Sequence, residues 1–474
     1  MQRLRSELDT LRGELAALKR QVFGRKSEKM PPVDQELRRD GSLTTDPKDG
    51  KKKRTTNADL MKKLTACVVN HFVPKDKQVC PRCVSSNFKP LGKGKTTVIF
   101  ELLPAVLQRQ VHVQQTLVCP CGKTIVTAPG PTRAFKKGRY GPRFIAHLIV
   151  TKCADAIGLN RLAERWRRQG VPMSRNTLVD QFQMAGLLLR PLADLLLTAI
   201  ATSDVVQGDS TTMRVQAKGK THRAYLLTFL DPLKKLIGYR FSLRRNGLTA
   251  CTVLGKSQGA FVADAGTEFN EVCEPGGRRR GGCMSHARRK FFDALSFVAE
   301  ARQPLDFILE LYRVERAAKD AGIQGSPEHL QLRQTKSQPV MEKLRTWLTT
   351  QQTLYQPKSP MRKAINYALN NWEALCLFLT DARIPLDNNT SEQVLRIVAQ
   401  GRKNFLFVGN EEAGHNIAVL YSLVMTAIAQ GLNAEDYLAD VLIRIKGMPN
   451  SRLHELLPQN WTPPATQPEP QDSA

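Results

Sequence analysis

The segment from residue 204 to residue 265 constrains the fold of this chain more than any other part. Three apolar runs predict strands joined by short turns, a helical pattern follows, and a fourth apolar run predicts another strand. In chain order, these elements are expected at Asp204–Val215, His222–Asp231, Lys235–Leu243, Leu248–Lys256 (the helix) and Gly259–Ala265. This order indicates an α/β region built on a sheet.

Two aspartates end apolar runs of this segment. Asp209 lies in VVQGDSTTMRV, in the first predicted strand, and Asp264 lies in GAFVADAG, in the fourth. The strand order is typical of the start of a ribonuclease-H-like fold, in which the first and fourth strands are adjacent, so we expect the two carboxylates to lie side by side. Taken singly, each aspartate is also typical of a turn or a cap.

A helix is predicted within IPLDNNTSEQVLRIVAQGRKNFLF, residues 384–407. The stretch opens with a polar cluster suited to a turn or a helix start, formed by Asp387, Asn388 and Asn389. From Thr390 onward, apolar residues recur at helical spacing and are expected to face a core; they are Val394, Leu395 and Val398.

Glu392 and Arg396 lie one turn apart on another face of this helix. By itself, such a pair is usually a solvated surface pair. The two aspartates change this interpretation, because Asp209, Asp264 and Glu392 together supply the oxygen ligands that hard divalent cations prefer. Two Mg²⁺ or Mn²⁺ ions held about 3.5–4 Å apart are suited to phosphoryl transfer, in which they contact the attacking and leaving oxygens.

The chain is strongly basic, with 71 Lys and Arg against 43 Asp and Glu in 474 residues, a formal net charge of +28. This excess favours a polyanionic partner, most simply nucleic acid, because neutralised phosphates release counterions. A ribosomal protein or a membrane-surface protein would share it. The hydrophobic content of 41% supports several folded domains.

No signal peptide is predicted, because residues 1–20 are charged throughout. No membrane span is expected either, since the nearest apolar run, LLLRPLADLLLTAI, contains Arg190 and Asp194. These patterns favour a cytoplasmic protein, in which the ten cysteines are thiols or metal ligands.

The first residues show an a/d seam of nearly three heptads, formed by Leu4, Leu8, Leu11, Leu15, Leu18 and Val22. It predicts a coiled coil through which copies of the chain associate, or a single amphipathic helix packed on its own domain. From about residue 24 to residue 59 the periodicity is lost and charges gather, including KKKR at 51–54, which predicts a flexible basic linker.

Two closely spaced cysteine pairs follow, Cys80 with Cys83 and Cys119 with Cys121. Strand-like alternation lies between them, so the pairs are typical of the two knuckles of a zinc ribbon with a structural Zn²⁺. The second pair has one intervening residue where two are commoner. The alternative is a buried pair and two free thiols.

A helix-turn-helix is predicted before the sheet. Leu159–Gln169 forms the first helix, residues 170–173 break it, and Ser174 can cap a second helix. Groove-facing residues of such a motif would be Arg175, Asn176 and Gln181. Many helical hairpins have this form without contacting DNA.

Cys283 and His286, which follow the second aspartate, have Cys-x-x-His spacing but lack an obvious second pair, Cys273 being the other candidate nearby. We expect them to support the core beside the site. Basic residues suited to phosphate contacts flank them and recur after Glu392; they are Arg288, Arg289, Lys290, Arg396, Arg402 and Lys403. The long interval before Glu392 carries helical patterns, in which Trp347 and Trp372 are expected to pack.

The chain resembles the transposases of the IS-sixty-six family of bacterial insertion sequences. The resemblance rests on several motifs in order: VFGRKSEK, CPRC, CPCG, TKCADAIGLNRLAERWRRQGVPMSRNTL, GDST, GGCMSHARRKFFDA, PLDNNTSEQ and GRKNFLF. It implies a DDE enzyme that cuts and transfers DNA strands with Mg²⁺ or Mn²⁺ at Asp209, Asp264 and Glu392. It also implies a structural zinc segment at the cysteine pairs, a nucleoid-associated location, a homo-oligomer and accessory proteins of the same element. A Cys-x-x-His after the second aspartate is similar to a motif of several DDE families.

The expected fold class is a multidomain α+β protein with a ribonuclease-H-like α/β catalytic core. The implied domains are a coiled-coil helix (1–23), a basic linker (24–63), a zinc-binding domain (64–135), a helix-turn-helix-like domain (136–200), a core in two parts (201–292 and 384–445) around an all-helical insertion (293–383), and a disordered tail (446–474). Two residues depart from the family pattern: Ser210 stands where Glu is common, and Gln393 where Arg is common. Either change is compatible with a weak enzyme.

Two other functions remain open from the sequence. A nuclease or resolvase on the same fold would use the same acids, although the helical insertion and the separate DNA-binding segments speak against it. A zinc-dependent DNA-binding protein without catalysis, such as a repressor of its own element, would bind DNA and leave it uncut.

Overall fold

The computed structural model of the chain describes residues 107, 109–118, 125–136, 138–171 and 173–463. These residues fall into two compact units that divide between Pro131 and Thr132. The predicted coiled-coil helix, the basic linker and the four predicted zinc ligands Cys80, Cys83, Cys119 and Cys121 lie outside the described residues.

The smaller unit contains an antiparallel pair of short strands, β1 (Thr116–Val118) and β2 (Ile125–Thr127). Outside the strands, the Gln114 side chain donates a hydrogen bond to the carbonyl of Ala128, 2.6 Å away. The pair flanks the second cysteine pair of the predicted zinc ribbon.

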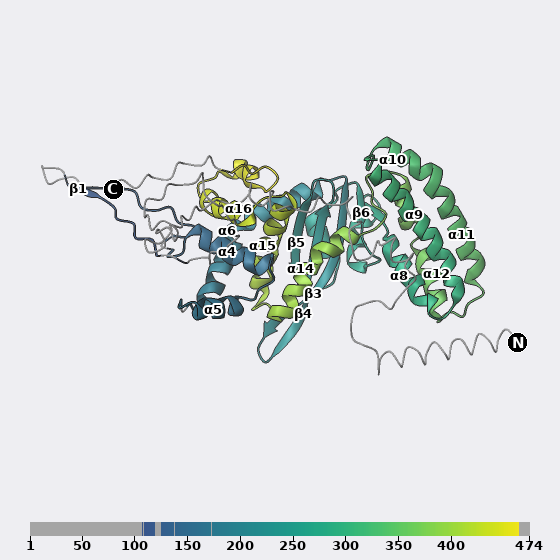
Figure 1. Ribbon diagram of the computed structural model, residues 1–474, viewed down its shortest axis with the longest axis horizontal. Helices are drawn as coiled ribbons and strands as arrows, with labels where there is room; N and C mark the ends of the chain where they lie inside the picture. The colour runs from purple at the N-terminus through teal and green to yellow at the C-terminus, as the bar shows by residue number, and fades with distance from the viewer. Residues whose placement is uncertain (1–106, 108, 119–124, 137, 172, 464–474) are drawn as a thin grey trace, which may run out of the picture. The chain divides into compact units, whose positions relative to one another are not determined.

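The larger unit is built on a mixed five-stranded sheet with the order β5-β4-β3-β6-β7. Its strands are β3 (Val205–Ala217), β4 (Lys220–Asp231), β5 (Leu236–Ser242), β6 (Ala260–Val262) and β7 (Arg279–Gly281). β3 runs antiparallel to β4 and parallel to β6, so the predicted adjacency of the first and fourth strands is confirmed. Figure 1 shows helices on both sides of this sheet.

Two glycines allow β3 and β6 to pack closely. At Gly208 an added Cβ would lie 2.2 Å from the ring of Phe261, which crosses β3 at this point. Gly259 enters β6 with a φ of +115°, and an added Cβ would lie 2.3 Å from the carbonyl oxygen of Asp204. That same carbonyl accepts the hydrogen bond from the N–H of Ala260 that begins the pairing.

Gly259→Ala is therefore expected to destabilise the protein by about 2–4 kcal/mol, because it combines an unfavourable φ with a clash against backbone. Gly170→Ala is the matched control, since Gly170 also has a positive φ, +80°, but no described atom lies within 4 Å of its added Cβ. Urea unfolding of both variants measures the difference. Equal destabilisation would show that φ alone, and not the approach of Asp204, accounts for the effect.

One hydrophobic core packs the sheet against helices that come before it and after it in the sequence. β5 packs against α15, and α15 packs against α6. The helices that contribute are α4 (Pro142–Cys153), α5 (Leu159–Arg168), α6 (Arg175–Ala201), α7 (Leu248–Leu254), α14 (Asn389–Phe405), α15 (Glu411–Ala429) and α16 (Ala434–Arg444). The apolar faces of α4, α5 and α6 thus share a core with the sheet, and the helix-turn-helix-like domain expected at residues 136–200 stays a prediction.

Two hydroxyl groups of α15 bind the outer edge of β5. The N–H of Tyr239 donates to Ser422 Oγ at 2.8 Å, and the N–H of Ile237 donates to Thr426 Oγ1 at 3.0 Å. Thr426 Oγ1 donates in turn to the carbonyl of Ile237 at 2.8 Å. Because both hydroxyls are buried, the helix satisfies backbone groups that a sheet edge otherwise leaves unpaired.

The break before α6 has the predicted cap. Ser174 Oγ accepts a hydrogen bond from the N–H of Thr177, as expected for an N-cap serine. By length and composition alone, α6 is apolar enough to cross a membrane, but core helices of soluble proteins meet the same criteria, and 44% of its most apolar window is buried inside the protein.

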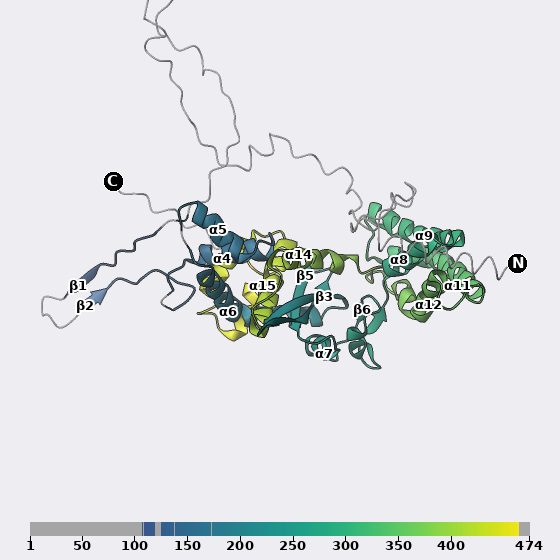
Figure 2. The same ribbon diagram turned by 90° about the horizontal axis from the view of Figure 1, so that it is seen from below.

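A second hydrophobic core lies between helices that follow β7. They are α8 (Met284–Leu295), α9 (Arg302–Asp320), α10 (Pro327–Leu332), a π-helical segment (Arg333–Ser337), α11 (Gln338–Gln352), α12 (Pro360–Asn370) and α13 (Trp372–Cys376). Figures 1 and 2 both show α9, α11 and α12 grouped beyond the β6 side of the sheet. The predicted helical character of this interval is confirmed, and Trp347 and Trp372 are partly buried against its core.

The buried Arg333 ties this helical group to the connection that leads to α14. Its guanidinium binds Glu315 at 2.7 Å and donates to the carbonyls of Phe378, Asp381 and Ile384. A buried charge is stable only when it is paired and hydrogen-bonded, and Arg333 meets both conditions.

The end of the chain differs from the predicted disordered tail at 446–474. A 3-10 helix spans Asn450–Leu456, and its last carbonyl accepts a hydrogen bond from the buried hydroxyl of Tyr437 at 2.9 Å. Trp461 packs edge-on against the Tyr437 ring and donates to Asp440. The prediction is wrong up to residue 463, because it weighed proline content and missed these anchoring contacts.

Candidate active site

The pairing of β3 with β6 places two of the predicted acids together. The parallel register runs from Val205↔Ala260 to Gln207↔Val262. Continued by two residues beyond the end of β6, this register would place Asp209 opposite Asp264. The sequence predicted that each aspartate ends an apolar run. Asp264 does lie just after β6, whereas β3 continues past Asp209.

The beginning of α14 is fixed to β3 beside Asp209. The side chain of Asn388 donates to the carbonyl of Gly208 at 2.8 Å, and the side chain of Gln207 donates to the carbonyl of Asp387 at 3.0 Å. Asn388 is also the N-cap of α14, and Glu392 lies in the first turn. These two hydrogen bonds therefore bring Glu392 to the sheet edge that carries the aspartates.

The acids interact electrostatically. The pKa of Asp209 is raised to about 7, mainly by burial and to a smaller extent by the charges of Asp264, Glu392 and Glu268, while the hydrogen bond from the N–H of Ser210 opposes the shift. Negative charges that act on one another in this way favour a bound cation or a proton.

Glu268 is a fourth acid that the sequence reasoning missed. Its side chain is 2% exposed, and its Oε1 accepts hydrogen bonds from Ser210 Oγ at 2.6 Å and Arg245 Nε at 2.9 Å. Burial tends to raise its pKa, but these bonds and the charge of Arg245 bring the pKa below its ordinary value. Glu268 is therefore held as a carboxylate.

The second oxygen of Glu268 is directed toward Asp264. A Cβ added at Gly266 would lie 2.7 Å from Glu268 Oε2 and 2.8 Å from Asp264 Oδ1, so both oxygens converge on this glycine. Glu268 Oε2 is buried and has no hydrogen-bond partner among the described residues. The sequence gives one weak signal for this residue, an acid four positions after Asp264.

The polar cluster before α14 acts as a support. The half-buried Asp387 accepts hydrogen bonds from the Tyr312 hydroxyl at 2.8 Å and from the backbone and side chain of Asn389 at 3.0 and 2.8 Å. Burial raises the pKa of Asp387 to about 6 although these bonds oppose the shift. Tyr312 and Asn389 thus hold the Asp387 side chain at the start of α14, and a role of Asp387, Asn388 and Asn389 in supporting the core stays a prediction.

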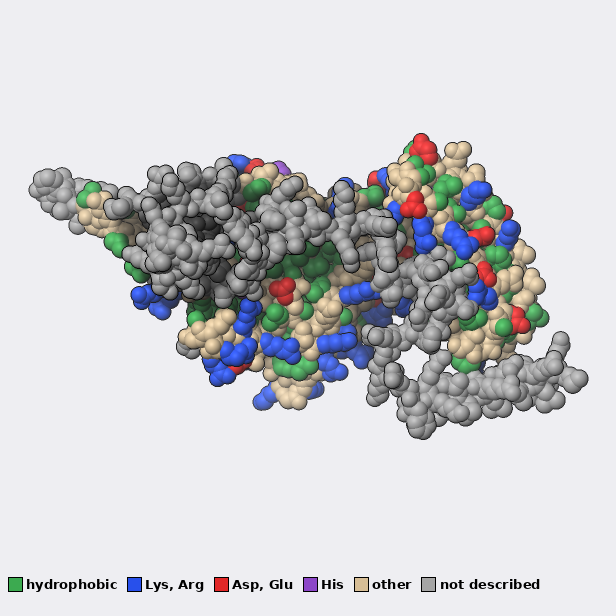
Figure 3. All heavy atoms as spheres, in the orientation of Figure 1, with side chains coloured by type: hydrophobic (Ala, Val, Ile, Leu, Met, Phe, Trp, Pro, Cys, Tyr) green, Lys and Arg blue, Asp and Glu red, His purple; other side chains and the backbone are tan. Residues whose placement is uncertain are grey.

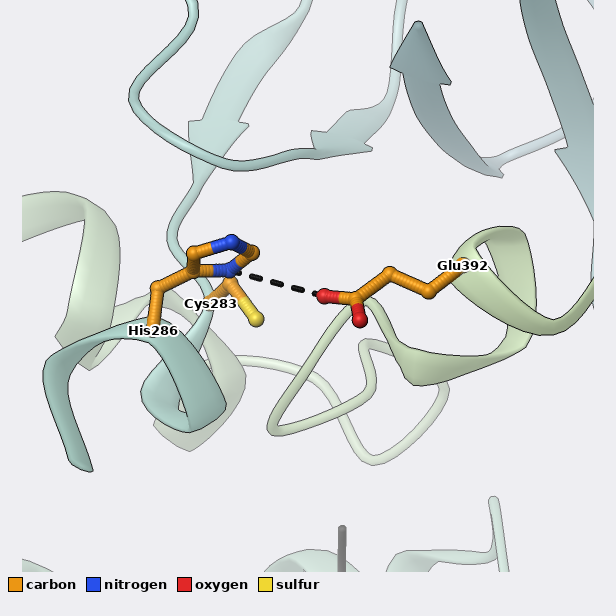
Figure 4. Close-up of side chains that lie close together, drawn as sticks. All are labelled: Cys283, His286 and Glu392. Carbon is orange, nitrogen blue, oxygen red and sulfur yellow. Dashed lines mark ion pairs between the residues drawn. The ribbon is translucent and has the colours of Figure 1, made fainter. Parts of the chain in front are cut away.

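Cys283 and His286 lie beside Glu392 (Figure 4). Cys283 is the N-cap residue of α8 and 1% exposed, and its Sγ accepts a hydrogen bond from the N–H of Asn388 at 3.3 Å. His286 Nδ1 lies 3.7 Å from Glu392 Oε1, and Arg289 Nη2 lies 3.8 Å from Glu392 Oε2. Burial lowers the pKa of His286 below its ordinary value. Cys273, the other candidate from the sequence, is not part of this group of potential ligands.

The predicted DNA-contacting residues fall into two groups. Those that are exposed are Arg175, Asn176, Arg289, Lys290, Arg396 and Lys403. The others are held by the protein: Gln181 is half-buried, Arg402 donates to Thr211 and Thr212 on β3, and Arg288 is only 5% exposed. Arg288 is therefore not placed to contact a phosphate at the surface, because α8 turns it inward.

Comparison with known proteins identifies the family of this chain. Residues 137–416 match the family described as Transposase IS66 family, and residues 422–459 match the IS66 C-terminal element. The chain is similar to two uncharacterized proteins of Sinorhizobium fredii. One, y4jD, is 30% identical over 95% of this chain and 94% of its own length, and the other, y4hP, is 29% identical over 81% of this chain and 73% of its own.

The family matches establish what class of enzyme this is. The chain belongs to the IS66 family of transposases, which are enzymes that act on DNA.

Proposed function

We propose that the protein is a DDE transposase that cuts the ends of an insertion sequence and joins them to target DNA. Asp209, Asp264 and Glu392 are its catalytic residues, and the sheet with its flanking helices is a ribonuclease-H-like core. One observation carries this proposal: the β3–β6 register and the hydrogen bond from Asn388 to Gly208 bring together three acids that are far apart in sequence.

The residues of the site suit divalent cations. Carboxylate oxygens are the ligands that Mg²⁺ and Mn²⁺ prefer, and Glu392 Oε1 is buried without a hydrogen-bond partner in the described part of the chain. The pKa of Asp209 is raised first by burial and then by the charges of Asp264, Glu392 and Glu268, and a bound cation would neutralise part of this negative charge. Bound ions would supply Lewis-acid activation of the attacking oxygen and charge stabilisation of the leaving oxygen.

Other side chains would orient the acids and bind the DNA. Asn388 and Gln207 orient the helix that carries Glu392, and Ser210 and Arg245 hold Glu268 next to Asp264. Arg289, which is half exposed and close to Glu392, is placed to bind a DNA phosphate.

A basic surface extends from this site along the larger unit. The carbonyl of Ala156, before α5, accepts a hydrogen bond from Asn404 of α14 at 2.8 Å, and Val215 of β3 forms a bridge with Val408. Lys and Arg side chains are concentrated over this region of the visible face (Figure 3). The exposed members are Arg161, Arg165, Arg167, Arg168, Arg214, Lys218, Lys220, Arg223, Arg396 and Lys403. We assign this surface to double-stranded DNA.

Replacing Arg396 and Lys403 together by alanine is expected to weaken DNA binding by about tenfold and to reduce the salt dependence of binding by about one to two phosphate contacts. Fluorescence anisotropy across a salt series measures both quantities. The matched control replaces Lys336 and Lys343, which are exposed on the helical group after β7. An equal loss in the control would indicate a non-specific charge effect.

The function is tested by incubating the full chain with DNA that contains an end of the element, in Mg²⁺ or Mn²⁺. We expect nicked and strand-transfer products that disappear with a chelator. A repressor would give a gel shift without cleavage, and a nuclease or resolvase would cleave without joining ends to target DNA. Either result would contradict the proposal.

Glu268→Gln is expected to lower the cleavage rate by about 10–100-fold, because it weakens the contacts with Ser210 and Arg245 that hold the carboxylate beside Asp264. A positioning role predicts that more Mg²⁺ is required for half-maximal rate while DNA affinity is unchanged. Glu271→Gln is the control, since Glu271 is exposed on the next 3-10 turn. An unchanged Mg²⁺ requirement in Glu268→Gln would contradict this role.

Four further parts of the proposal rest on sequence and family alone. Cys80, Cys83, Cys119 and Cys121 would hold a structural Zn²⁺, and the heptads of residues 4–22 would join copies of the chain. Accessory proteins of the same element are further partners, and the cytoplasm, at the nucleoid, is the proposed location.

A further inference from the structure

Two polar atoms in the group formed by Cys283, His286 and Glu392 lack hydrogen-bond partners in the described part of the chain. His286 Nδ1 and Glu392 Oε1 are both buried, and within the described residues neither has a hydrogen-bond partner, although the two atoms lie 3.7 Å apart. Cys283 Sγ completes the group, and all three atoms lie within 4.8 Å of one another. Figure 4 shows the imidazole and the carboxylate facing each other with the sulfur beside them.

We propose that Cys283, His286 and Glu392 bind one thiophilic metal ion, preferably Zn²⁺. This ion competes with the catalytic Mg²⁺ for Glu392. The binding half of the proposal stands on this geometry alone. The competing half rests on the proposed function, in which Glu392 is a catalytic ligand.

The chemistry of the three side chains selects the metal. A thiolate and an imidazole are ligands that Zn²⁺ accepts readily, whereas Mg²⁺ prefers oxygen. Three protein ligands leave a fourth tetrahedral position for water. On binding, the Cys283 thiol releases its proton to solvent and the sulfur forms the metal bond.

The geometry requires only a small adjustment. Tetrahedral Zn²⁺ with bonds of about 2.0–2.3 Å holds its ligand atoms about 3.3–3.6 Å apart. The separation of 3.7 Å between His286 and Glu392 is close to that value, and the upper limit of 4.8 Å for the group is within reach of side-chain rotation. Burial raises the pKa of the Cys283 thiol to about 12, and the hydrogen bond from the N–H of Asn388 to Cys283 Sγ opposes this shift.

The ligands come from two elements that are already fixed to each other. The N–H of Met284, at the start of α8, donates to the carbonyl of Leu386 at 3.1 Å, just before α14. Cys283 and His286 on one side and Glu392 on the other are thus held across a rigid junction. Zn²⁺ bound here would remove Glu392 from the carboxylate set of Asp209 and Asp264.

Co²⁺ is the probe for the binding half, because its bond to a thiolate gives a charge-transfer absorption band that is absent with oxygen ligands. The full chain is first saturated with Zn²⁺, and the excess is removed, so that the predicted four-cysteine site is filled. Brief treatment with a weak chelator then frees the more open three-ligand site, and Co²⁺ is titrated in. We expect one equivalent of Co²⁺ to bind with the thiolate band.

Three variants identify the ligands. Cys283→Ser should abolish the thiolate band, and His286→Ala should lower the affinity for Co²⁺ by about 100-fold or more, as loss of a direct ligand exceeds the effect of losing an outer partner. Cys376→Ser is the matched control, because Cys376 is also a free cysteine but lies outside the group. A band that persists in Cys283→Ser, or an affinity that is unchanged in a folded His286→Ala protein, would overturn the site.

Activity measures the competing half. Micromolar Zn²⁺ is expected to inhibit Mg²⁺-supported cleavage by the wild type and by Cys376→Ser, and excess Mg²⁺ should relieve the inhibition. In His286→Ala, whatever activity remains should tolerate about 100-fold more Zn²⁺. Equal Zn²⁺ sensitivity in all three proteins would overturn the competition. If the wild type cuts no DNA while the Co²⁺ band appears, the transposase proposal fails and the metal site stands.

Discussion

Asp264→Asn is expected to lower the rate of Mg²⁺-dependent strand cleavage by on the order of 10³-fold or more, because it removes a charged ligand at the reacting centre. The side chain keeps its size and can still accept the hydrogen bond from the N–H of Gly266, so the fold should be retained. Asp209→Asn and Glu392→Gln should have losses of the same order. Single-turnover cleavage of end-containing DNA measures the rates.

Asp204→Asn is the matched control for these substitutions. Asp204 lies just before β3, but it is exposed and forms an ion pair with Arg383 at 2.6 Å. Removing an exposed ion pair changes stability by less than about 1 kcal/mol and leaves the carboxylate site intact. An active Glu392→Gln enzyme would refute the three-acid site, whereas a loss of activity in Asp204→Asn would point to damage of the fold.

The second large effect concerns stability in the absence of divalent cations. The pKa of Asp209 is about 7 in the folded chain against an ordinary value of 3.8, so folding favours the protonated form. The corresponding stability is present below pH 4 and is lost as the pH rises through 7. Wild-type protein in a chelator should therefore lose stability relative to Asp209→Asn between pH 4 and pH 8.

Mg²⁺ should reverse this difference at pH 8. An ion that binds only the folded state, at a concentration a hundred times its dissociation constant, raises the free energy of unfolding by about 2.7 kcal/mol. Asp209→Asn should gain much less, because it lacks one of the carboxylates that bind the ion. Thermal unfolding of both proteins at pH 5 and pH 8, with and without Mg²⁺, tests the prediction. Equal stabilisation of the two proteins by Mg²⁺ would contradict metal binding at Asp209.

The sequence could predict where the three acids lie, because their positions follow from the order of the strands and helices along the chain. Apolar runs and turns predict which strands are neighbours, and the register, continued beyond β6, would place Asp209 opposite Asp264. The helix that carries Glu392 was also predictable, because Asn388 and the apolar spacing after it indicate where the helix begins. The neighbouring strands and the start of the helix are both predicted by patterns that extend over several residues.

Features that depend on local turns were not accessible. Glu268 reaches Ser210 only because a 3-10 turn follows Gly266, and one acid in a loop gives no sign of such a turn. Arg288 and Arg289 are adjacent in the sequence, yet one is buried and the other exposed, since the orientation of α8 depends on its packing against α9 and α12. The tail was misjudged for the same reason, because composition does not reveal the contacts of Trp461.

The hydroxyl groups of Ser422 and Thr426 have a consequence for how copies of the protein can join. They bind the outward N–H groups of Tyr239 and Ile237 on the last strand of the sheet. A foreign strand that approached this border would find those donors occupied and a helix in its path. Extension of one sheet into another copy is therefore blocked at these two positions of β5, and any self-association of the chain would use other surfaces.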